Sequence, residues 1–272
     1  KDHHRWKRVE AEKIIGPFIR YLKKDGKIES FQIAGSFRRK KETVGDVDIL
    51  AACHRGCKIM DRFTGYEDVK EVLSSGGTRS SVILKSGLQV DLRVVPQAGF
   101  GAALHYFTGS QSHTVAVRKI AVQKNFKLNE YGAYRDDKRV FGRTEEEIFS
   151  RLGLKYIEPE LRENRGEIDA AREDNLPDLV KLDDIRGDLH VHTNATDGRY
   201  SMEEMVDAAR KKGYQYVAIS DHSRKVSVAG GLGPKELEKQ IDRIDQLQER
   251  TSGIRILKSV EVDILEDGAL DL

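Results

Sequence analysis

The stretch Gly45-Asp46-Val47-Asp48-Ile49-Leu50-Ala51-Ala52-Cys53 decides the fold, because it is an apolar run interrupted by two aspartates. Its composition predicts a strand over 44–53. Residues i and i+2 of a strand point to the same face, so Asp46 and Asp48 would converge on one point. An isolated Asp-x-Asp on a strand can equally turn its acids toward solvent, so the interpretation needs further signals.

A third acid, Asp91, lies in the second arm of a predicted hairpin, with arms at 78–84 and 88–95 and a turn at 85–87. Three carboxylates on adjacent strands repel each other unless a cation neutralises them. Mg²⁺ suits such a site, since it binds a few carboxylates together with phosphate oxygens of a substrate. Two such ions could activate a hydroxyl and stabilise the leaving oxygen of a phosphoryl or nucleotidyl transfer.

An anion-binding segment precedes these acids. It reads Gly35-Ser36-Phe37-Arg38-Arg39. The glycine allows backbone amides to approach an anion closely, the serine donates a hydrogen bond and the arginines supply positive charge. Together with the three acids, this segment predicts transfer chemistry on a nucleoside triphosphate.

Other elements of the first half follow from periodicity and composition. We predict a strand at 31–34 and helices at 6–23, 66–73, 100–107 and 113–125, with irregular structure from there to about 154. The charged, proline-flanked stretch 158–184 is predicted to be a connector that contains a short helix at 166–172.

Strands and helices alternate beyond the connector. Strands are predicted at 188–192, 216–220 and 254–265, and helices at 201–212 and 234–250. Ser201 and Glu204 have the spacing of a capping box at the start of the first of these helices. Alternation at this spacing predicts parallel βαβ units.

Metal-ligand side chains gather at the predicted ends of these strands. Because ligands at the carboxyl ends of parallel strands meet at one edge of a sheet, we expect a metal site there. The candidates are His190, His192, Asp197, His222 and Glu261. Cys53, His54 and Cys57 have no suitable further partners in the sequence and are interpreted as incidental.

The motifs of the first half resemble those of family X DNA polymerases in order and spacing. They are Gly35–Arg39, Gly45–Asp48, Val90-Asp91-Leu92-Arg93 and Tyr106-Phe107-Thr108-Gly109-Ser110. The resemblance implies that Asp46 and Asp48 bind two Mg²⁺ ions. It also implies that Asp91 helps bind the catalytic ion and activates the primer 3′-hydroxyl.

Further roles are implied by the same resemblance. Gly35, Ser36, Arg39 and Gly45 would hold the phosphates of the nucleotide, and Tyr106, Phe107 and Gly109 its sugar and base. Arg118 would contact the template, and Arg93 would switch between Asp48 and another partner. Gln111 and Thr114 depart from the residues of better-known members, which puts base-pair checking in doubt.

The second half resembles the opening motifs of the polymerase-and-histidinol-phosphatase (PHP) domain. This family is a distorted barrel whose Mn²⁺ or Zn²⁺ centre hydrolyses phosphoesters. The resemblance makes His190, His192, Asp197, His222 and Glu261 ligands and suggests that Asp221 orients His222. Because the remaining family ligands would follow Leu272, we expect weak or no hydrolysis by this fragment. By the same resemblance, we expect the helix-hairpin-helix DNA grip of the family's N-terminal region to lie outside these 272 residues.

The predicted fold is α/β and multidomain: a nucleotidyltransferase palm with a mixed sheet, a thumb, and an incomplete βαβ PHP barrel. The predicted boundaries are 1–108 for the palm, 109–157 for the thumb, 158–185 for a linker and 186–272 for the PHP part.

Charge is divided unevenly along the 272 residues, whose formal net charge is +2. Residues 1–158 carry 30 Lys and Arg against 20 Asp and Glu, whereas residues 159–272 carry 17 against 25. A basic first half favours a polyanionic partner such as nucleic acid, although ordinary surface variation could also produce the split. No apolar run of about 20 residues and no secretory leader are visible. Two cysteines exclude a disulfide scaffold.

We therefore expect a cytoplasmic, nucleoid-associated, monomeric repair polymerase of bacterial or archaeal origin. It would extend a primer in gapped DNA with deoxynucleoside triphosphates, and its full-length parent would carry a PHP 3′-5′ exonuclease. Three alternatives stay open at this point. They are a template-independent nucleotidyltransferase, a PHP phosphoesterase with a DNA-tethering module, and a non-catalytic DNA-binding module.

Overall fold

The computed structural model describes residues 4–272. The chain divides into two compact units, the first ending at Pro177 and the second comprising Asp178–Leu272. Each unit is described by itself. Within the described residues, none of the helices is both long and apolar enough to cross a membrane.

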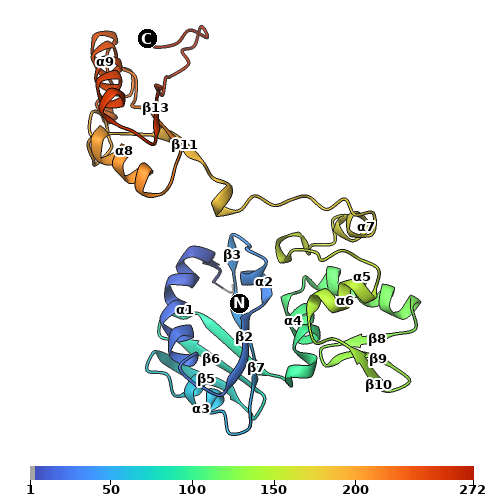
Figure 1. Cartoon of the computed structure of the whole chain (residues 1–272). Helices are drawn as coiled ribbons and strands as arrows, with labels where there is room; N and C mark the ends of the chain where they lie inside the picture. Colours follow the sequence, from blue (N-terminus) through green and yellow to red (C-terminus); the bar gives the residue numbers. More distant parts are fainter. Residues whose placement is uncertain (1–3) are drawn as a thin grey trace. The chain divides into compact units, whose positions relative to one another are not determined.

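A five-stranded mixed sheet forms the core of the first unit (Figure 1). Its strands, in spatial order, are β2 (Ile28–Ile33), β4 (Asp46–Cys53), β7 (Gln89–Val94), β6 (Arg79–Leu84) and β5 (Val69–Ser75). Strands β4 and β7 are parallel, and the other neighbouring pairs are antiparallel. The parallel pairing determines which residues of β4 and β7 stand side by side.

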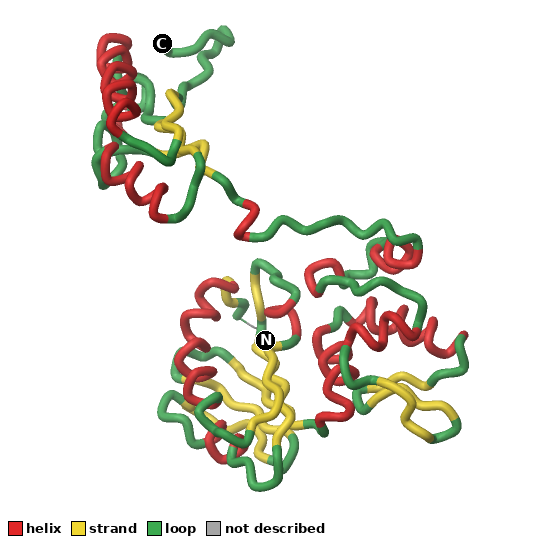
Figure 2. Tube along the Cα trace, viewed as in Figure 1, coloured by secondary structure: helices red, strands yellow, loops and turns green. Residues whose placement is uncertain are grey.

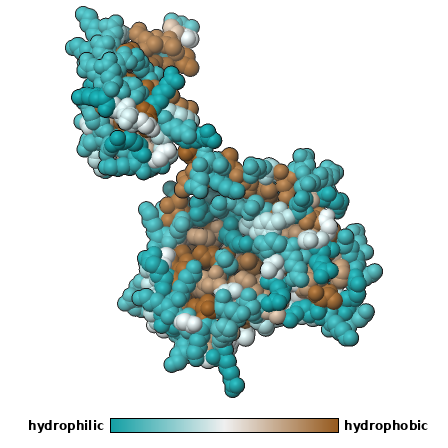
Figure 3. All heavy atoms as spheres, viewed as in Figure 1, coloured by the Kyte–Doolittle hydropathy of each residue, from teal (hydrophilic) through white to brown (hydrophobic). Residues whose placement is uncertain are grey.

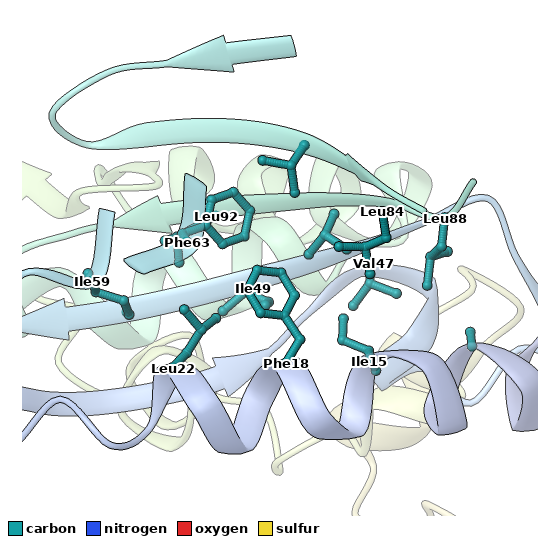
Figure 4. Close-up of a cluster of buried hydrophobic side chains, with 14 of the residues drawn as sticks. Ile15, Phe18, Leu22, Val47, Ile49, Ile59, Phe63, Leu84, Leu88 and Leu92 are labelled. Atoms are coloured by element: carbon teal, nitrogen blue, oxygen red, sulfur yellow. The ribbon is translucent and has the colours of Figure 1, made fainter. Parts of the chain in front are cut away.

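One face of this sheet is covered by helix α1 (Arg8–Leu22), with α3 (Ile59–Thr64) beside it (Figure 4). Ile15, Phe18 and Leu22 of α1 point toward Val47 and Ile49 of β4. These side chains are at most 1% exposed. Since β4 alternates, burial of Val47 and Ile49 on this face turns the two intervening aspartates to the other face.

The opposite face packs against helix α4 (Phe100–Thr108), which follows a short 3₁₀ turn, η1 (Gln97–Gly99). Leu50 and Ala52 of β4 contact Phe100, Ala103 and Leu104 in a second apolar cluster. The short helix α2 (Gly35–Arg38) borders this face beside α4, whereas β1 (Trp6–Lys7), paired with β3 (Thr43–Val44), packs with α1. The aspartates thus lie beside an apolar cluster rather than on an open surface.

The remainder of the first unit is helical around a small antiparallel sheet. Its elements are α5 (Gln111–Gln123), β8 (Lys127–Asn129), β9 (Gly132–Arg135), β10 (Lys138–Phe141) and α6 (Glu145–Arg151). The three short strands replace the irregular structure predicted before residue 154. A strand of three or four residues is too short to show the alternation on which such predictions depend.

Residues 158–177 pack against these helices. This segment contains η2 (Pro159–Leu161) and α7 (Glu167–Arg172), and Ile168 and Ala171 join the apolar cluster of α5 and α6. The predicted connector therefore divides at Pro177: its first part belongs to the first unit, and the extended part follows in the second. The predicted helix at 166–172 is confirmed by α7.

The second unit contains three parallel strands flanked by helices (Figure 2). Its elements are η3 (Leu182–Asp184), β11 (Gly187–Val191), α8 (Met202–Lys211), β12 (Tyr216–Ile219), η4 (Ser227–Ala229), α9 (Pro234–Arg250) and β13 (Arg255–Lys258). The capping box of Ser201 and Glu204 is present. Parallel pairing of β11, β12 and β13 confirms the predicted βαβ arrangement.

The surface of the second unit is mostly hydrophilic on the face shown in Figure 3, with apolar side chains gathered near its C-terminal end. A groove of about 330 Å³ lies between α9 and the segment after β13. Its apolar lining consists of Pro234, Leu237, Ile241, Ile244, Val260 and Leu272.

Two predicted elements are wrong or too long. The helix expected at 66–73 is replaced by the turn before β5 and by β5 itself, because antiparallel pairing with β6 overrides the local helical pattern. The strand expected at 254–265 is regular only over β13 and continues as isolated bridges.

Candidate active sites

Three aspartates share one face of the five-stranded sheet. Asp48 of β4 stands directly opposite Asp91 of the parallel strand β7, and Asp46 stands opposite Gln89. Asp46 and Asp48 lie on the same face because they are two residues apart. The sheet register therefore brings together the three carboxylates that the sequence singled out.

The carboxylates disturb one another's ionisation. Burial, followed by the charges of Asp46 and Asp91, raises the pKa of Asp48 to about 7, although Arg93 and Arg39 oppose the rise. Burial and the charge of Asp91 also raise the pKa of Asp46. Oxygen ligands that resist ionisation for this reason suit a divalent cation, which would remove the repulsion. This donor set fits Mg²⁺.

Asp91 is held from two sides. It is 8% exposed, accepts a hydrogen bond from Ser81 Oγ, and lies 3.3 Å from Gln89 Nε2. Ser81 stands opposite Asp91 on β6. Sequence reasoning missed Ser81, although the register of the predicted hairpin placed it beside Asp91.

Gly35 lies directly above Asp48. Its φ is +64°, and a Cβ atom at this position would collide with Asp48 Oδ2. The preceding amide of Ala34 donates a 2.8 Å hydrogen bond to the carbonyl of Asp48. Only glycine allows the chain to pass so close to the carboxylate, so α2 with Ser36 is fixed next to the aspartates.

A cavity of about 440 Å³ opens beside these groups. It is lined by most of the residues that sequence reasoning assigned to metal, nucleotide or template. The lining is Gly35, Ser36, Arg39, Asp46, Asp48, Tyr106, Phe107, Gly109, Gln111, Thr114, Val115 and Arg118. Of the other predicted residues, Asp91, Arg93 and Gly45 are not part of this lining.

Arg93 stacks on the aromatic wall of this site. Its guanidinium carbon lies 4.3 Å from the centre of the Phe107 ring. Its charge still opposes the rise in the pKa of Asp48, although the two side chains do not form an ion pair within the described residues. The predicted switch of Arg93 stays a prediction.

Arg5 is a basic residue near the site that sequence reasoning missed. Its guanidinium donates to Thr43 Oγ1 at 3.0 Å and to the Thr43 carbonyl at 2.7 Å. Its charge opposes the rise in the pKa of Asp46, and a Cβ on Gly45 would lie 3.7 Å from its Nη1. The pairing of β1 with β3 carries Arg5 to this position, and no local pattern predicted that pairing.

Two histidines near the Tyr106–Ser110 motif are buried, which disfavours contact with DNA. His105 is 1% exposed and His113 is fully buried. Burial, with the charge of Arg162, lowers the pKa of His105 to about 3. His113 Nδ1 lies 2.6 Å from Glu167 Oε1. The cysteine pair, with sulfurs 2.8 Å apart, does not belong to a three-ligand group within the described residues.

The second unit brings its predicted ligands into two overlapping groups. His190, His192 and Glu261 form one, and His192, Asp197 and His222 form the other. In each group the ligand atoms lie within 4.8 Å of one another. These are the only such groups among residues 4–272, so the aspartates of the first unit are drawn together less tightly.

Glu261 and His192 connect the two groups. Glu261 Oε2 lies 2.9 Å from Nε2 of both His190 and His192, and His192 Nδ1 lies 2.8 Å from Asp197 Oδ1. The hydrogen bond from His192 lowers the pKa of Asp197, and that from His190 lowers the pKa of Glu261. Imidazole and carboxylate together are the ligands of Zn²⁺ and Mn²⁺ sites, so the donor set fits either ion.

Asp221 does not orient His222, in contrast to the prediction. Its buried carboxylate accepts hydrogen bonds of 2.7 Å from the amide and the hydroxyl of Thr193 and from the Thr196 hydroxyl. Gln240 donates a further bond of 2.5 Å. Adjacency in sequence suggested the wrong partner: Asp221 instead fixes the loop that carries Asp197.

Comparison with known families agrees with the division of the chain into two units. Residues 5–97 match the DNA polymerase beta palm, residues 103–163 the DNA polymerase beta thumb, and residues 188–270 the PHP domain. The exact domain boundaries stay a prediction.

Curated relatives include the DNA polymerase/3′-5′ exonuclease PolX of Bacillus subtilis, 39% identical over 96% of this chain and 45% of the relative. The Repair DNA polymerase X of African swine fever virus is 30% identical over 47% of this chain and 78% of the relative. DNA polymerase lambda of Rattus norvegicus is 31% identical over 47% of this chain and 28% of the relative.

The chain spans about half the length of the Bacillus subtilis relative. The match to the viral polymerase nevertheless covers most of that protein, and the palm, thumb and PHP matches follow one another in the order of the two units. The chain therefore belongs to the family X DNA polymerases that carry a PHP domain.

Proposed function

We propose that the chain carries the polymerase centre of a template-directed DNA polymerase for short-gap or base-excision repair. The reaction joins a deoxynucleotide to a primer 3′-hydroxyl and releases pyrophosphate. One observation carries the proposal. The carboxylates of Asp46 and Asp48, fixed next to Asp91 by the sheet register, line the same cavity as Ser36 and Arg39.

The three aspartates have separate tasks in this proposal. Asp46 and Asp48 would hold two Mg²⁺ ions, and Asp91, oriented by Ser81 and Gln89, would share one of them. When bound, Mg²⁺ favours ionisation of the primer 3′-hydroxyl and neutralises charge on the phosphates. The chain itself places the acids and keeps the neighbouring sheet apolar.

The walls of the cavity would bind the rest of the substrate. The triphosphate would be held by Gly35, Ser36, Arg39 and Gly45. Arg5 would contribute a further positive charge to this part of the site. The aromatic wall and the turn after it, Tyr106, Phe107 and Gly109, would contact sugar and base, and Arg118 the template. Arg93, stacked on Phe107, would change partners as the site closes.

Primer extension on DNA with a one-nucleotide gap tests the proposal. With Mg²⁺ the wild-type protein should extend the primer by the templated nucleotide, and Asp91→Asn should reduce the rate by at least about 10³-fold. Asp68→Asn is the matched control, because Asp68 pairs with Lys85 on the exposed side of the palm. Equal activity of Asp91→Asn and wild type would contradict the assignment.

Omitting the template distinguishes the nearest alternative. A template-independent nucleotidyltransferase should still incorporate label on single-stranded primer, whereas the proposed enzyme should not. Incorporation at equal rates with and without template would favour the alternative. A non-catalytic DNA-binding module should bind duplex with a steep salt dependence and need no metal.

We propose a second function for the second unit, phosphoester hydrolysis with Mn²⁺ or Zn²⁺. The two ligand groups that share His192 support it, and the Bacillus subtilis relative is named a 3′-5′ exonuclease.

Release of nucleotides from 3′-labelled DNA with Mn²⁺ tests the second function. His192→Ala should abolish it, and His54→Ala, an exposed histidine of the palm, should not. If Asp48→Ala left every nucleotide-incorporation assay unchanged while His192→Ala removed hydrolysis, the palm would be a tethering module only.

The proposed organisation is palm 1–108, thumb 109–157 and PHP part 186–272; of the predicted linker 158–185, residues 158–177 pack with the thumb helices and only the rest connects the two units. The proposed partners are gapped or primed DNA and deoxynucleoside triphosphates, for a monomer in the nucleoid. Sedimentation of the protein with and without gapped DNA checks the monomer.

A further inference from the structure

The basic run 38–41 meets Glu160 and Glu163 of the segment 158–177, which packs on the thumb helices. Arg39 Nε donates to Glu163 Oε1 at 2.8 Å, and Lys41 Nζ lies 3.6 Å from the same oxygen. Lys40 Nζ lies 2.5 Å from Glu160 Oε1. Arg39 and Glu163 are 124 positions apart, and their pairing joins the palm to the segment 158–177 that packs on the thumb helices.

The guanidinium of Arg39 is held at two of its three nitrogens, Nε and Nη1. In addition to the bond to Glu163, its Nη1 donates a 2.5 Å bond to the Thr108 carbonyl, at the end of α4. A Cβ on Gly109 would lie 3.2 Å from the same nitrogen. The side chain is 14% exposed and lines the cavity. Nη2 donates no hydrogen bond to the described residues, so this donor stays available to a ligand in the cavity.

Glu163 stays charged in this position. Burial opposes its ionisation, but the hydrogen bond and the charge of Arg39 outweigh burial and lower its pKa. A guanidinium held by a carboxylate and a carbonyl has little freedom left to lose when it binds a phosphate. Released from Glu163, Arg39 would keep its charge but lose one of the two bonds that set its plane.

We propose that Glu163 is a positioning residue of the nucleotide pocket: it holds the Arg39 guanidinium in the orientation that binds the triphosphate. This inference rests on the proposed polymerase function. Glu163 itself need not touch the nucleotide. The opposite role, competition of Glu163 with the phosphates for Arg39, predicts the opposite change in affinity and is an outcome of the test.

Steady-state gap filling with a full set of variants tests the inference. Glu163→Ala should raise the KM for the nucleotide about tenfold and change kcat less than about twofold, because it removes ground-state binding. Glu163→Gln keeps an acceptor for Arg39 Nε and should give a KM between those of wild type and Glu163→Ala. The inhibition constant of pyrophosphate, which lacks sugar and base, should rise with the KM.

Glu160→Ala is the matched control, because it removes an acid of the same segment that pairs with Lys40, outside the cavity lining. Its KM should equal that of wild type. In an Arg39→Ala background, Glu163→Ala should add no further rise, since it would act only through Arg39.

A KM of Glu163→Ala equal to or below that of wild type overturns the inference, as does an equal rise for Glu160→Ala or an additive effect with Arg39→Ala. If Glu163→Ala does not fold, Glu163→Gln replaces it in the double-mutant cycle with Arg39→Ala, and the same outcomes support or overturn the inference. If wild type fills no gap, the proposed function fails by itself. Calorimetric binding of pyrophosphate with Mg²⁺ to wild type and Glu163→Gln then decides the inference, because equal affinities overturn it.

Discussion

The functional carboxylates of the palm–thumb unit are buried or half-buried, whereas in the PHP unit Asp197 is exposed and Glu261 half-buried, both beside imidazoles. In the palm, burial and like charge raise the pKa of Asp48 to about 7. In the PHP unit, hydrogen bonds from histidines lower the pKa of both Asp197 and Glu261. The carboxylates of the first site require cations to offset their mutual repulsion. Those of the second site are stabilised by hydrogen bonds from the histidines of the same site.

The difference shows what each fold must supply. A site of three carboxylates is destabilising until a cation binds, so the surrounding palm needs a large apolar core. A site of imidazoles and carboxylates can assemble before metal binds, because each acid has an imidazole nitrogen within hydrogen-bond distance: His192 Nδ1 for Asp197 and His190 Nε2 for Glu261. The thumb adds a third arrangement, a buried acid paired with two arginines.

The largest expected difference concerns that buried acid. Glu145 is 3% exposed and bonds Arg38, Arg162 and the Tyr156 hydroxyl. Glu145→Ala should lower the free energy of unfolding of the first unit by about 3–5 kcal/mol. The change removes the carboxylate that pairs with two arginines, one of which is fully buried.

The fluorescence of the single tryptophan, Trp6 of β1, reports unfolding of the first unit alone. Glu261→Ala in the PHP unit serves as the comparison and should leave this transition unchanged. A Glu145→Ala transition at the wild-type denaturant concentration would show that the buried network contributes nothing.

A smaller effect of opposite sign is expected for the palm. At pH 8 without divalent metal, the free energy of unfolding of Asp48→Asn should be higher than that of wild type by about 1–3 kcal/mol. Because the folded pKa lies near 7, above the ordinary value of 3.8, the cost of ionisation grows as pH rises from about 4 to 7. Adding Mg²⁺ should stabilise wild type more than the variant. A less stable Asp48→Asn would refute this account of the site.

Acid should destabilise the first unit through Glu145. The Glu145 pKa is about 2, because hydrogen bonds from Arg38 and the charge of Arg162 outweigh burial. A lowered pKa gives stability above the ordinary value of about 4.5 that is lost as pH falls toward 2. Wild-type stability should therefore fall across this range, and that of Glu145→Gln should fall less. Parallel acid curves for the two proteins would contradict the prediction.

The smallest expected effect separates two histidines of the PHP unit. His192 belongs to both ligand groups and His190 to one. His192→Ala should weaken Zn²⁺ binding more than His190→Ala, by about tenfold. Competitive titration with a chromophoric chelator measures both affinities. Equal losses would show that the two groups do not share His192 as a ligand.

The sequence was sufficient to predict features that depend on short-range patterns. Asp46 and Asp48 share a face because of a two-residue period, and the hairpin puts Asp91 on a strand beside β6; the parallel pairing that sets Asp91 opposite Asp48 is long-range. The capping box at Ser201 is equally local. Such features follow from backbone geometry, which acts over a few residues.

Contacts across long separations could not be read in this way. The bond of Arg5 with Thr43 spans 38 residues, and the bond of Arg39 with Glu163 spans 124. Charge alone offers many possible partners for each arginine, and only the packing of palm against thumb selects one. The same applies to Asp221, whose partners lie 19 to 28 residues away rather than next to it.

The docking of residues 158–177 on the thumb has a consequence for biosynthesis. All strands of the palm sheet lie within residues 28–94, so this sheet can assemble while later segments are still inside the ribosome. The pocket cannot be complete then, because Arg39 awaits Glu163 and His113 awaits Glu167. During translation, the nascent palm would expose its acidic face before the chain that completes it has been made.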